Sequence, residues 1–136
     1  MAAVNVLLDT CVVIRLERVD LGDLADAQPF LSAVTIAELA FGLDIDDPVE
    51  RFARSERFYT ARDQFEVLSF DVRAAEIYGQ MAALVRRNGR SPRPRRMDLQ
   101  IAATAAAHEM PVLTSNVRDF AGIERLVEVI AVATIR

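Results

Sequence analysis

The chain has 136 residues, a length typical of one domain, and 52% of them are hydrophobic, which excludes a globally disordered protein. Its net charge of −4 argues against a simple basic nucleic-acid binder. There is no apolar run of the ~20 residues needed to span a membrane, no signal-peptide pattern, and no partner for an internal disulfide with Cys11. We therefore expect a single cytoplasmic domain over residues 1–136 that does not enter a membrane.

The chain is rich in acidic residues and nearly lacks lysine and histidine. There are twenty acidic residues, no lysine, and one histidine, His108. A metal-free ribonuclease usually needs histidine or lysine as base, acid and phosphate clamp. If this chain acts on phosphate, carboxylates that hold metal ions are the favoured route.

The N-terminal stretch contains an apolar run that leads to one acid. Residues 4–8 predict a buried strand that ends at Asp9, and Thr10 is available to cap a helix over residues 11–18. A carboxylate in this position is costly unless a partner or a metal compensates its charge. Residues 19–29 are rich in aspartate and predict a surface loop or a short helix.

The next segment repeats the pattern of a strand followed by a polar helix start. Residues 30–34 predict a strand, and Thr35 with Glu38 forms a capping-box pattern that opens a helix weakened or ended at Gly42. Pro48 opens a further helix over residues 48–65. Its aromatic residues, at roughly helical spacing, are expected in the core or in an interface; they are Phe52, Phe58, Tyr59 and Phe65.

The C-terminal half continues the alternation of strands and helices. The predicted elements are a strand over residues 67–70, a helix capped by Asp71 that runs to Arg87, a loop over residues 88–94, a small-residue helix that starts at residues 97–98, and strands over residues 112–114 and 126–130. This alternation predicts an α/β fold with a five-stranded, mainly parallel sheet and helices on both faces.

Polar residues either follow a predicted strand or, as Asp98 does, begin the helix that leads into the next strand. They are Asp9, Glu38, Asp98, Asn116 and Asp119. In a parallel sheet, ligands bind beyond the carboxyl ends of the strands. Taken alone, each residue also has a purely structural interpretation, as a helix cap, a capping-box acid or a turn residue. Their recurrence at one predicted sheet edge favours a shared site.

Four stretches in order resemble the PIN-domain ribonucleases of the VapC toxin type, and the resemblance covers nearly the whole chain. They are Asp9, the segment SAVTIAELAFG at 32–42, the segment DLQIAATA at 98–105, and the segment TSNVRDF at 114–120. The resemblance implies a PIN-like fold and a magnesium-dependent endoribonuclease, with manganese as an alternative metal. It also implies a VapB-type antitoxin laid across the active site, with an antitoxin arginine able to enter the acid cluster, and a homodimer.

Carried over by position, the resemblance makes Asp9, Glu38 and Asp98 metal-site acids. Some relatives have an aspartate where this chain has Asn116, so either Asn116 as a metal ligand or Asp119 as a catalytic acid completes the site, and one or two metals fit. Magnesium prefers oxygen ligands and lowers the pKa of its bound water. Attack by such a water leaves a 5′-phosphate and a 3′-hydroxyl.

The arginines before Asp98 are candidates for RNA contacts. Six arginines fall within residues 86–96, and Arg93, Arg95 and Arg96 lead directly into Asp98. Because phosphate contacts position a nucleic acid, we expect these three to guide the RNA backbone towards the acids.

Two other acid-dependent classes fit poorly, and one non-catalytic alternative remains. A phosphoacceptor receiver domain needs a lysine, which is absent, and an aspartyl phosphatase needs a second aspartate two residues after the first, where this chain has Cys11. The alternative function is a non-catalytic PIN-like module that binds RNA or protein.

Overall fold

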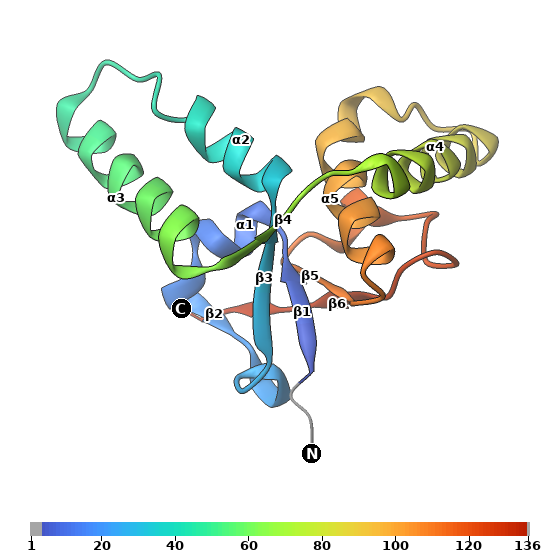
Figure 1. Cartoon of the computed structure of the whole chain (residues 1–136), viewed down its shortest axis with the longest axis horizontal. Helices are drawn as coiled ribbons and strands as arrows, with labels where there is room; N and C mark the ends of the chain where they lie inside the picture. The colour runs from blue at the N-terminus through green and yellow to red at the C-terminus, as the bar shows by residue number, and fades with distance from the viewer. Residues whose placement is uncertain (1–3, 136) are drawn as a thin grey trace.

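A computed structural model describes residues 4–135 of the chain. The helices and strands follow one another in the order shown in Figure 1. They are β1 (Asn5–Leu8), α1 (Thr10–Ile14), β2 (Val19–Asp20), β3 (Gln28–Ser32), α2 (Ala33–Phe41), α3 (Pro48–Gln64), β4 (Glu66–Leu68), α4 (Val72–Arg87), α5 (Arg96–Ala107), β5 (Val112–Thr114), β6 (Val129–Ala131) and β7 (Ala133–Thr134). Four short 3-10 helices complete the set, namely η1 (Leu16–Arg18), η2 (Gly22–Leu24), η3 (Arg93–Arg95) and η4 (Val117–Phe120).

Five strands form one parallel sheet in the order β4-β3-β1-β5-β6. The chain builds outward from β1 to β3 and β4, then crosses back to add β5 and β6 on the other side of β1. Strand order therefore reverses at β1, which is where ligands bind in open α/β sheets. The prediction of an α/β fold with a five-stranded parallel sheet is confirmed.

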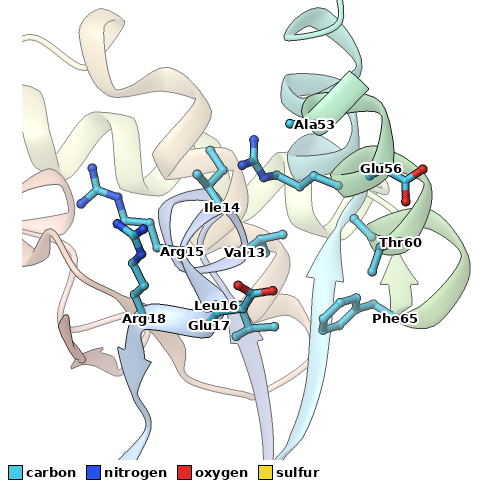
Figure 2. Close-up of a pocket in the computed structure, with 12 residues that line it drawn as sticks. Val13, Ile14, Arg15, Leu16, Glu17, Arg18, Ala53, Glu56, Thr60 and Phe65 are labelled. Carbon is cyan, nitrogen blue, oxygen red and sulfur yellow. The ribbon is translucent and has the colours of Figure 1, made fainter. Parts of the chain in front are cut away.

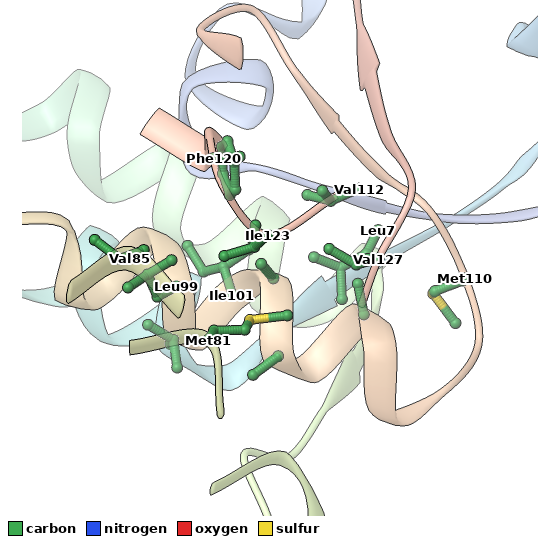
Figure 3. Packing of buried hydrophobic residues seen from close by; sticks show 14 residues of the cluster. Leu7, Met81, Val85, Leu99, Ile101, Met110, Val112, Phe120, Ile123 and Val127 are labelled. Atoms are coloured by element: carbon green, nitrogen blue, oxygen red, sulfur yellow. The ribbon is translucent and has the colours of Figure 1, made fainter. Parts of the chain in front are cut away.

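Alternate residues of β1 enter two different hydrophobic clusters. Leu7 packs with residues of α4 and α5, whereas Val6 and Leu8 pack with residues of α1, α2 and α3. This two-residue period places helices on both faces of the sheet. Figure 3 shows the first cluster, in which Phe120 and Ile123 from the segment after β5 pack close to α5.

Several element boundaries differ from those predicted. The second strand covers 28–32 rather than 30–34, and the last strand of the main sheet covers 129–131 rather than 126–130. The predicted helix over 11–18 is only five residues long as α1 and continues as η1. Residues 19–29 contain the strand β2 and the turn η2 instead of only a loop or helix.

The sequence also gave no signal for a second sheet. Strand β2 pairs antiparallel with β7, through Val19 opposite Thr134 and Asp20 opposite Ala133. Each strand is two residues long, which is too short for a periodic pattern. Across residues 4–135, no helix has the length and hydrophobicity that a membrane crossing requires.

We expect Phe120→Ala to lower the free energy of unfolding by about 3–5 kcal/mol. Phe120 is fully buried, and it lies in η4 beside the candidate acids, so its loss leaves a cavity under that turn. Urea unfolding of the isolated protein measures the change. The control is Phe52→Ala, because Phe52 is 68% exposed and its truncation should cost no more than ~0.5 kcal/mol. Equal effects of the two variants would contradict the packing described here.

Candidate active site

Asp9 is the central residue of the candidate site. It follows β1, is 4% exposed, and is the N-cap of α1. Its Oδ1 accepts a hydrogen bond from the Thr10 backbone N–H at 2.9 Å, and its Oδ2 accepts one from Thr114 Oγ1 at 2.8 Å. Asp9, not Thr10, is therefore the cap of α1. Since β1 and β5 are adjacent, Thr114 at the end of β5 fixes the carboxylate directly.

Glu38 lies on α2 and faces the start of α1. Its Oε1 accepts a hydrogen bond of 2.8 Å from Thr10 Oγ1, and Thr35 Oγ1 lies 3.0 Å from Thr10 Oγ1. The predicted capping box between Thr35 and Glu38 is wrong, because α2 begins at Ala33 and Ser32 is its cap. Glu38 is therefore not a capping residue of α2. Its carboxylate is directed towards α1, whose N-cap is Asp9.

Asp98 lies in the first turn of α5, two residues after the helix begins at Arg96. It is therefore not the N-cap that the structural interpretation required. Among residues 4–135, no group donates a hydrogen bond to its side chain. The helix that carries it is tied to α2, because Ser32 Oγ and Thr104 Oγ1 lie 3.0 Å apart in the core. Thr104 itself donates to the Gln100 carbonyl, so Ser32 is the donor to Thr104.

Asn116 and Asp119 follow β5 and bind each other. Asn116 Nδ2 donates to Asp119 Oδ2 at 2.7 Å, and the Asn116 backbone N–H donates to Thr114 Oγ1 at 3.0 Å. Asn116 is exposed, whereas Asp119 is half-buried on η4. Thr114 therefore links Asp9 to the turn that carries both candidate residues.

Repulsion and burial raise the pKa of three of the acids. Burial is the largest cause for Asp98, followed by the charges of Asp9, Asp119 and Glu38, and together they raise its pKa to about 7 although Arg95 lowers it. Burial raises the pKa of Asp9 despite its hydrogen bonds from Thr114, Cys11 and Thr10. Burial also raises the pKa of Glu38, with a smaller contribution from Asp9. The charges of Asp9, Glu38 and Asp119 all act on Asp98, so the four carboxylates face the same region of the molecule.

The donor set fits a hard divalent cation. Carboxylate oxygens are the ligands that magnesium and manganese prefer, and a bound cation relieves the repulsion that raises these pKa values. Within residues 4–135, no three acidic, histidine or cysteine side chains already converge as closely as bound ligands do. A cation would thus be held by Asp9 and Asp98, with Glu38 and the Asn116–Asp119 pair on either side.

Cys11 also contacts the residues of this site. Its Sγ donates to Asp9 Oδ2 at 3.2 Å and accepts a hydrogen bond of 3.1 Å from Ser115 Oγ. Cys11 is half-buried. Its position in the sequence could have indicated this contact. Cys11 lies two residues after Asp9, in the first turn of a short helix, so its side chain is near the helix cap.

The three candidate RNA-binding arginines are placed differently. Arg93 and Arg96 are exposed. Arg95 is half-buried, and its guanidinium donates to the carbonyl oxygens of Asp119 at 2.7 Å and Ala121 at 3.0 Å. The structure therefore does not present Arg95 to solvent with the other two.

One cavity lies away from the acids. It has a volume of about 600 Å³ and is bounded by α1, η1 and α3, as Figure 2 shows. Residues from α1 and η1, including Val13 and Leu16, form one wall, and residues from α3 with Phe65 form the other. Because none of the candidate acids lines this cavity, it is a separate surface feature.

The fold and the site together define a class of protein: an α/β domain with a carboxylate cluster where the order of a parallel sheet reverses. A family model described as the PIN domain matches residues 6–126. The chain therefore belongs to the PIN domain family.

Individual relatives are consistent with this assignment. The chain is 32% identical over 90 residues to the tRNA(fMet)-specific endonuclease VapC of Shigella flexneri, a match that spans 66% of this chain but only 65% of that protein. It is 28% identical over 126 residues to the ribonuclease VapC of Rickettsia bellii (strain RML369-C), covering 90% and 92% of the two chains. Among solved structures it is similar to VapBC-5, a toxin–antitoxin system of Mycobacterium tuberculosis, with 31% identity, a TM-score of 0.81, and 93% and 98% coverage.

We expect the metal-free protein to be more stable at about pH 5 than at about pH 8. The pKa of Asp98 rises from 3.8 to about 7 on folding, so the folded chain binds a proton more tightly than the unfolded chain. Stability is then lost as pH rises through about 7, by roughly 1–2 kcal/mol once solvent screening of this half-exposed group is allowed for. Urea unfolding in chelator measures the difference.

The matched variant for this measurement is Asp98→Asn, which cannot ionise. Its stability should change less between the two pH values than that of the unmodified protein. If the two proteins lose the same stability as pH rises, the raised pKa assigned to Asp98 is wrong.

Proposed function

We propose that this chain is a magnesium-dependent endoribonuclease that acts as the toxin of a VapBC-type toxin–antitoxin pair, with manganese as an alternative metal. The observation that carries the proposal is the convergence of Asp9, Glu38, Asp98 and Asp119, from four separate segments, at the carboxyl edge of the sheet. Membership of the PIN family and the similarity to VapC ribonucleases support it. Because RNA is the substrate, we place the activity in the cytoplasm.

Each residue has a distinct part in this mechanism. Asp9 is locked by its hydrogen bonds and Asp98 is not, so Asp9 sets the position of the site and Asp98 is free to adjust as a ligand. The bound metal supplies a water of lowered pKa and neutralises charge on the phosphate. Glu38, which has a raised pKa and one oxygen held by Thr10, is suited to accept the proton of the attacking water.

Arg93 and Arg96 are the candidates for contact with the RNA backbone. Both are exposed and flank the start of α5, which carries Asp98 two residues after Arg96. Cations at this place attract the phosphates towards the acids and offset the net negative charge of the chain.

A VapB-type antitoxin is the proposed protein partner, since the structure of VapBC-5 belongs to a toxin–antitoxin system. Phe58 and Phe65 pack on the second core cluster, whereas Phe52 and Tyr59 are 68% and 50% exposed. The two exposed side chains are available to a partner, either an antitoxin segment or a second copy in a homodimer. By family resemblance, an antitoxin arginine would enter the acid cluster in place of the metal's charge.

A non-catalytic PIN-like module that binds RNA or protein is the alternative function. Asn116 favours it slightly, because a neutral amide stands where some relatives have a carboxylate. The retention of Asp9, Glu38 and Asp98 in one cluster opposes it.

We expect labelled RNA, including a transfer RNA pool, to be cut in magnesium and to stay intact in chelator or with the Asp9→Asn protein. Loss of the central carboxylate should lower the rate at least ~100-fold, because the metal loses its best-positioned ligand. Products with 5′-phosphates and 3′-hydroxyls identify water as the nucleophile. Cleavage that survives in Asp9→Asn protein, purified in the same way, would contradict the assigned site.

We expect Arg93→Ala/Arg96→Ala protein to bind RNA more weakly and with a flatter dependence on salt. Each lost phosphate contact reduces the slope of log K against log salt by roughly 0.7 for single-stranded RNA. Filter binding in calcium, at several salt concentrations, measures the slope. The control is Arg73→Gln, an exposed arginine on α4 outside the 86–96 segment. An unchanged slope in the double variant would show that these arginines do not contact RNA.

A further inference from the structure

Arg95 differs from the other arginines near the acids in where its guanidinium is directed. It lies in η3, immediately before α5, and its Nε and Nη2 atoms each donate to a backbone carbonyl of the segment 119–121. The acceptors, Asp119 O and Ala121 O, are two residues apart, which matches the fixed fork of a guanidinium. One side chain therefore joins the start of α5 to the end of η4.

The remaining nitrogen of Arg95 supports an internal role. Its Nη1 atom is buried and has no hydrogen-bond partner within residues 4–135, so it is not directed at solvent. A residue that captured RNA phosphates would instead expose its donors, as Arg93 and Arg96 do. The charge of Arg95 also acts on Asp98, whose pKa it lowers.

The bridged segments carry two of the four acids. Asp98 follows Arg95 by three residues on α5, and Asp119 supplies one of the two bridged carbonyls. From Asp119, contacts continue through Asn116 to Thr114 and from Thr114 to Asp9. The guanidinium thus begins a chain of hydrogen bonds that runs from the start of α5 to Asp9.

We propose that Arg95 is a positioning residue that clamps η4 to α5 and so holds Asp119 against Asp98, rather than a contact for RNA. This inference rests on the proposed nuclease function for its activity readout. Both hydrogen bonds of Arg95 are accepted by backbone oxygens, whose positions do not depend on a side-chain rotamer. They therefore fix the backbone of residues 119–121 relative to the start of α5. Its charge opposes the repulsion between the two acids that it draws together.

The first test needs neither metal nor RNA. Amide hydrogen exchange is measured for Asp119 and Ala121, whose N–H groups donate to the carbonyl oxygens of Asn116 and Arg118. Arg95→Gln should raise exchange at both amides at least ~10-fold, while Arg73→Gln, with the same change in charge, should leave them unchanged. Unaltered exchange in Arg95→Gln protein overturns the clamp whatever the activity of the enzyme.

The second test asks whether Arg95 acts through Asp119. We expect Arg95→Gln and Asp119→Asn each to lower kcat at least ~10-fold at saturating magnesium. The double variant should fall no more than ~3-fold below the slower single variant, because the clamp has nothing left to position. Multiplication of the two losses would instead show an independent role and overturn the proposal.

Arg95→Lys separates the clamp from the charge, since lysine keeps the charge but lacks the planar fork. Its kcat should fall to within ~3-fold of that of Arg95→Gln, and the salt slope of RNA binding should match the unmodified protein. Near-normal kcat in the lysine variant, or a flattened salt slope, would overturn the proposal. Failure of the unmodified protein to cut RNA would count against the proposed function, while the exchange measurement still decides the clamp.

Discussion

The burial of several carboxylates close to one another, at one edge of the sheet, is the constraint on which the rest of the site depends. The parallel topology brings the ends of β1, β3 and β5 together, and each is followed by an acid-bearing segment. Bringing like charges together while removing water from them raises the pKa of Asp9, Glu38 and Asp98. A bound cation would relieve this electrostatic cost, and the metal dependence that we propose rests on that argument.

The rigid part of the molecule lies directly behind these acids. Helix α5 has small buried residues, including Ala102, Ala103 and Ala105, all fully buried. Short side chains allow the helix to approach the sheet closely, and the hydroxyl pair of Ser32 and Thr104 ties it to α2. The acids on α2 and α5 therefore stand on two helices whose separation is fixed in the core, which suits a site that must place oxygens accurately.

The sequence predicted the order of the elements well because strong local signals mark them. Apolar runs predicted the strands of the main sheet. Asp71 was correctly predicted as the cap of α4, and Gly42 as the end of α2. It predicted the acids by position, but not their contacts. Ser32 replaced Thr35 as a cap, a choice between neighbouring hydroxyls that only tertiary packing decides. The contact of Arg95 with residues 119–121 joins positions about 25 residues apart, so no local sequence pattern predicts it.

The contacts that fix the geometry of the site are mostly neutral. Hydroxyl groups of Thr10 and Thr114, the thiol of Cys11 and the amide of Asn116 orient Asp9, Glu38 and Asp119 without adding charge. A neutral donor holds a carboxylate in place without cancelling the attraction that the carboxylate has for a metal ion, whereas a salt bridge would compete with the ion. The guanidinium of Arg95 donates two of its nitrogens to backbone carbonyls and not to a carboxylate. Neutral groups thus supply the orientation of these acids, and the charge of the carboxylates is left available for the cation that we propose.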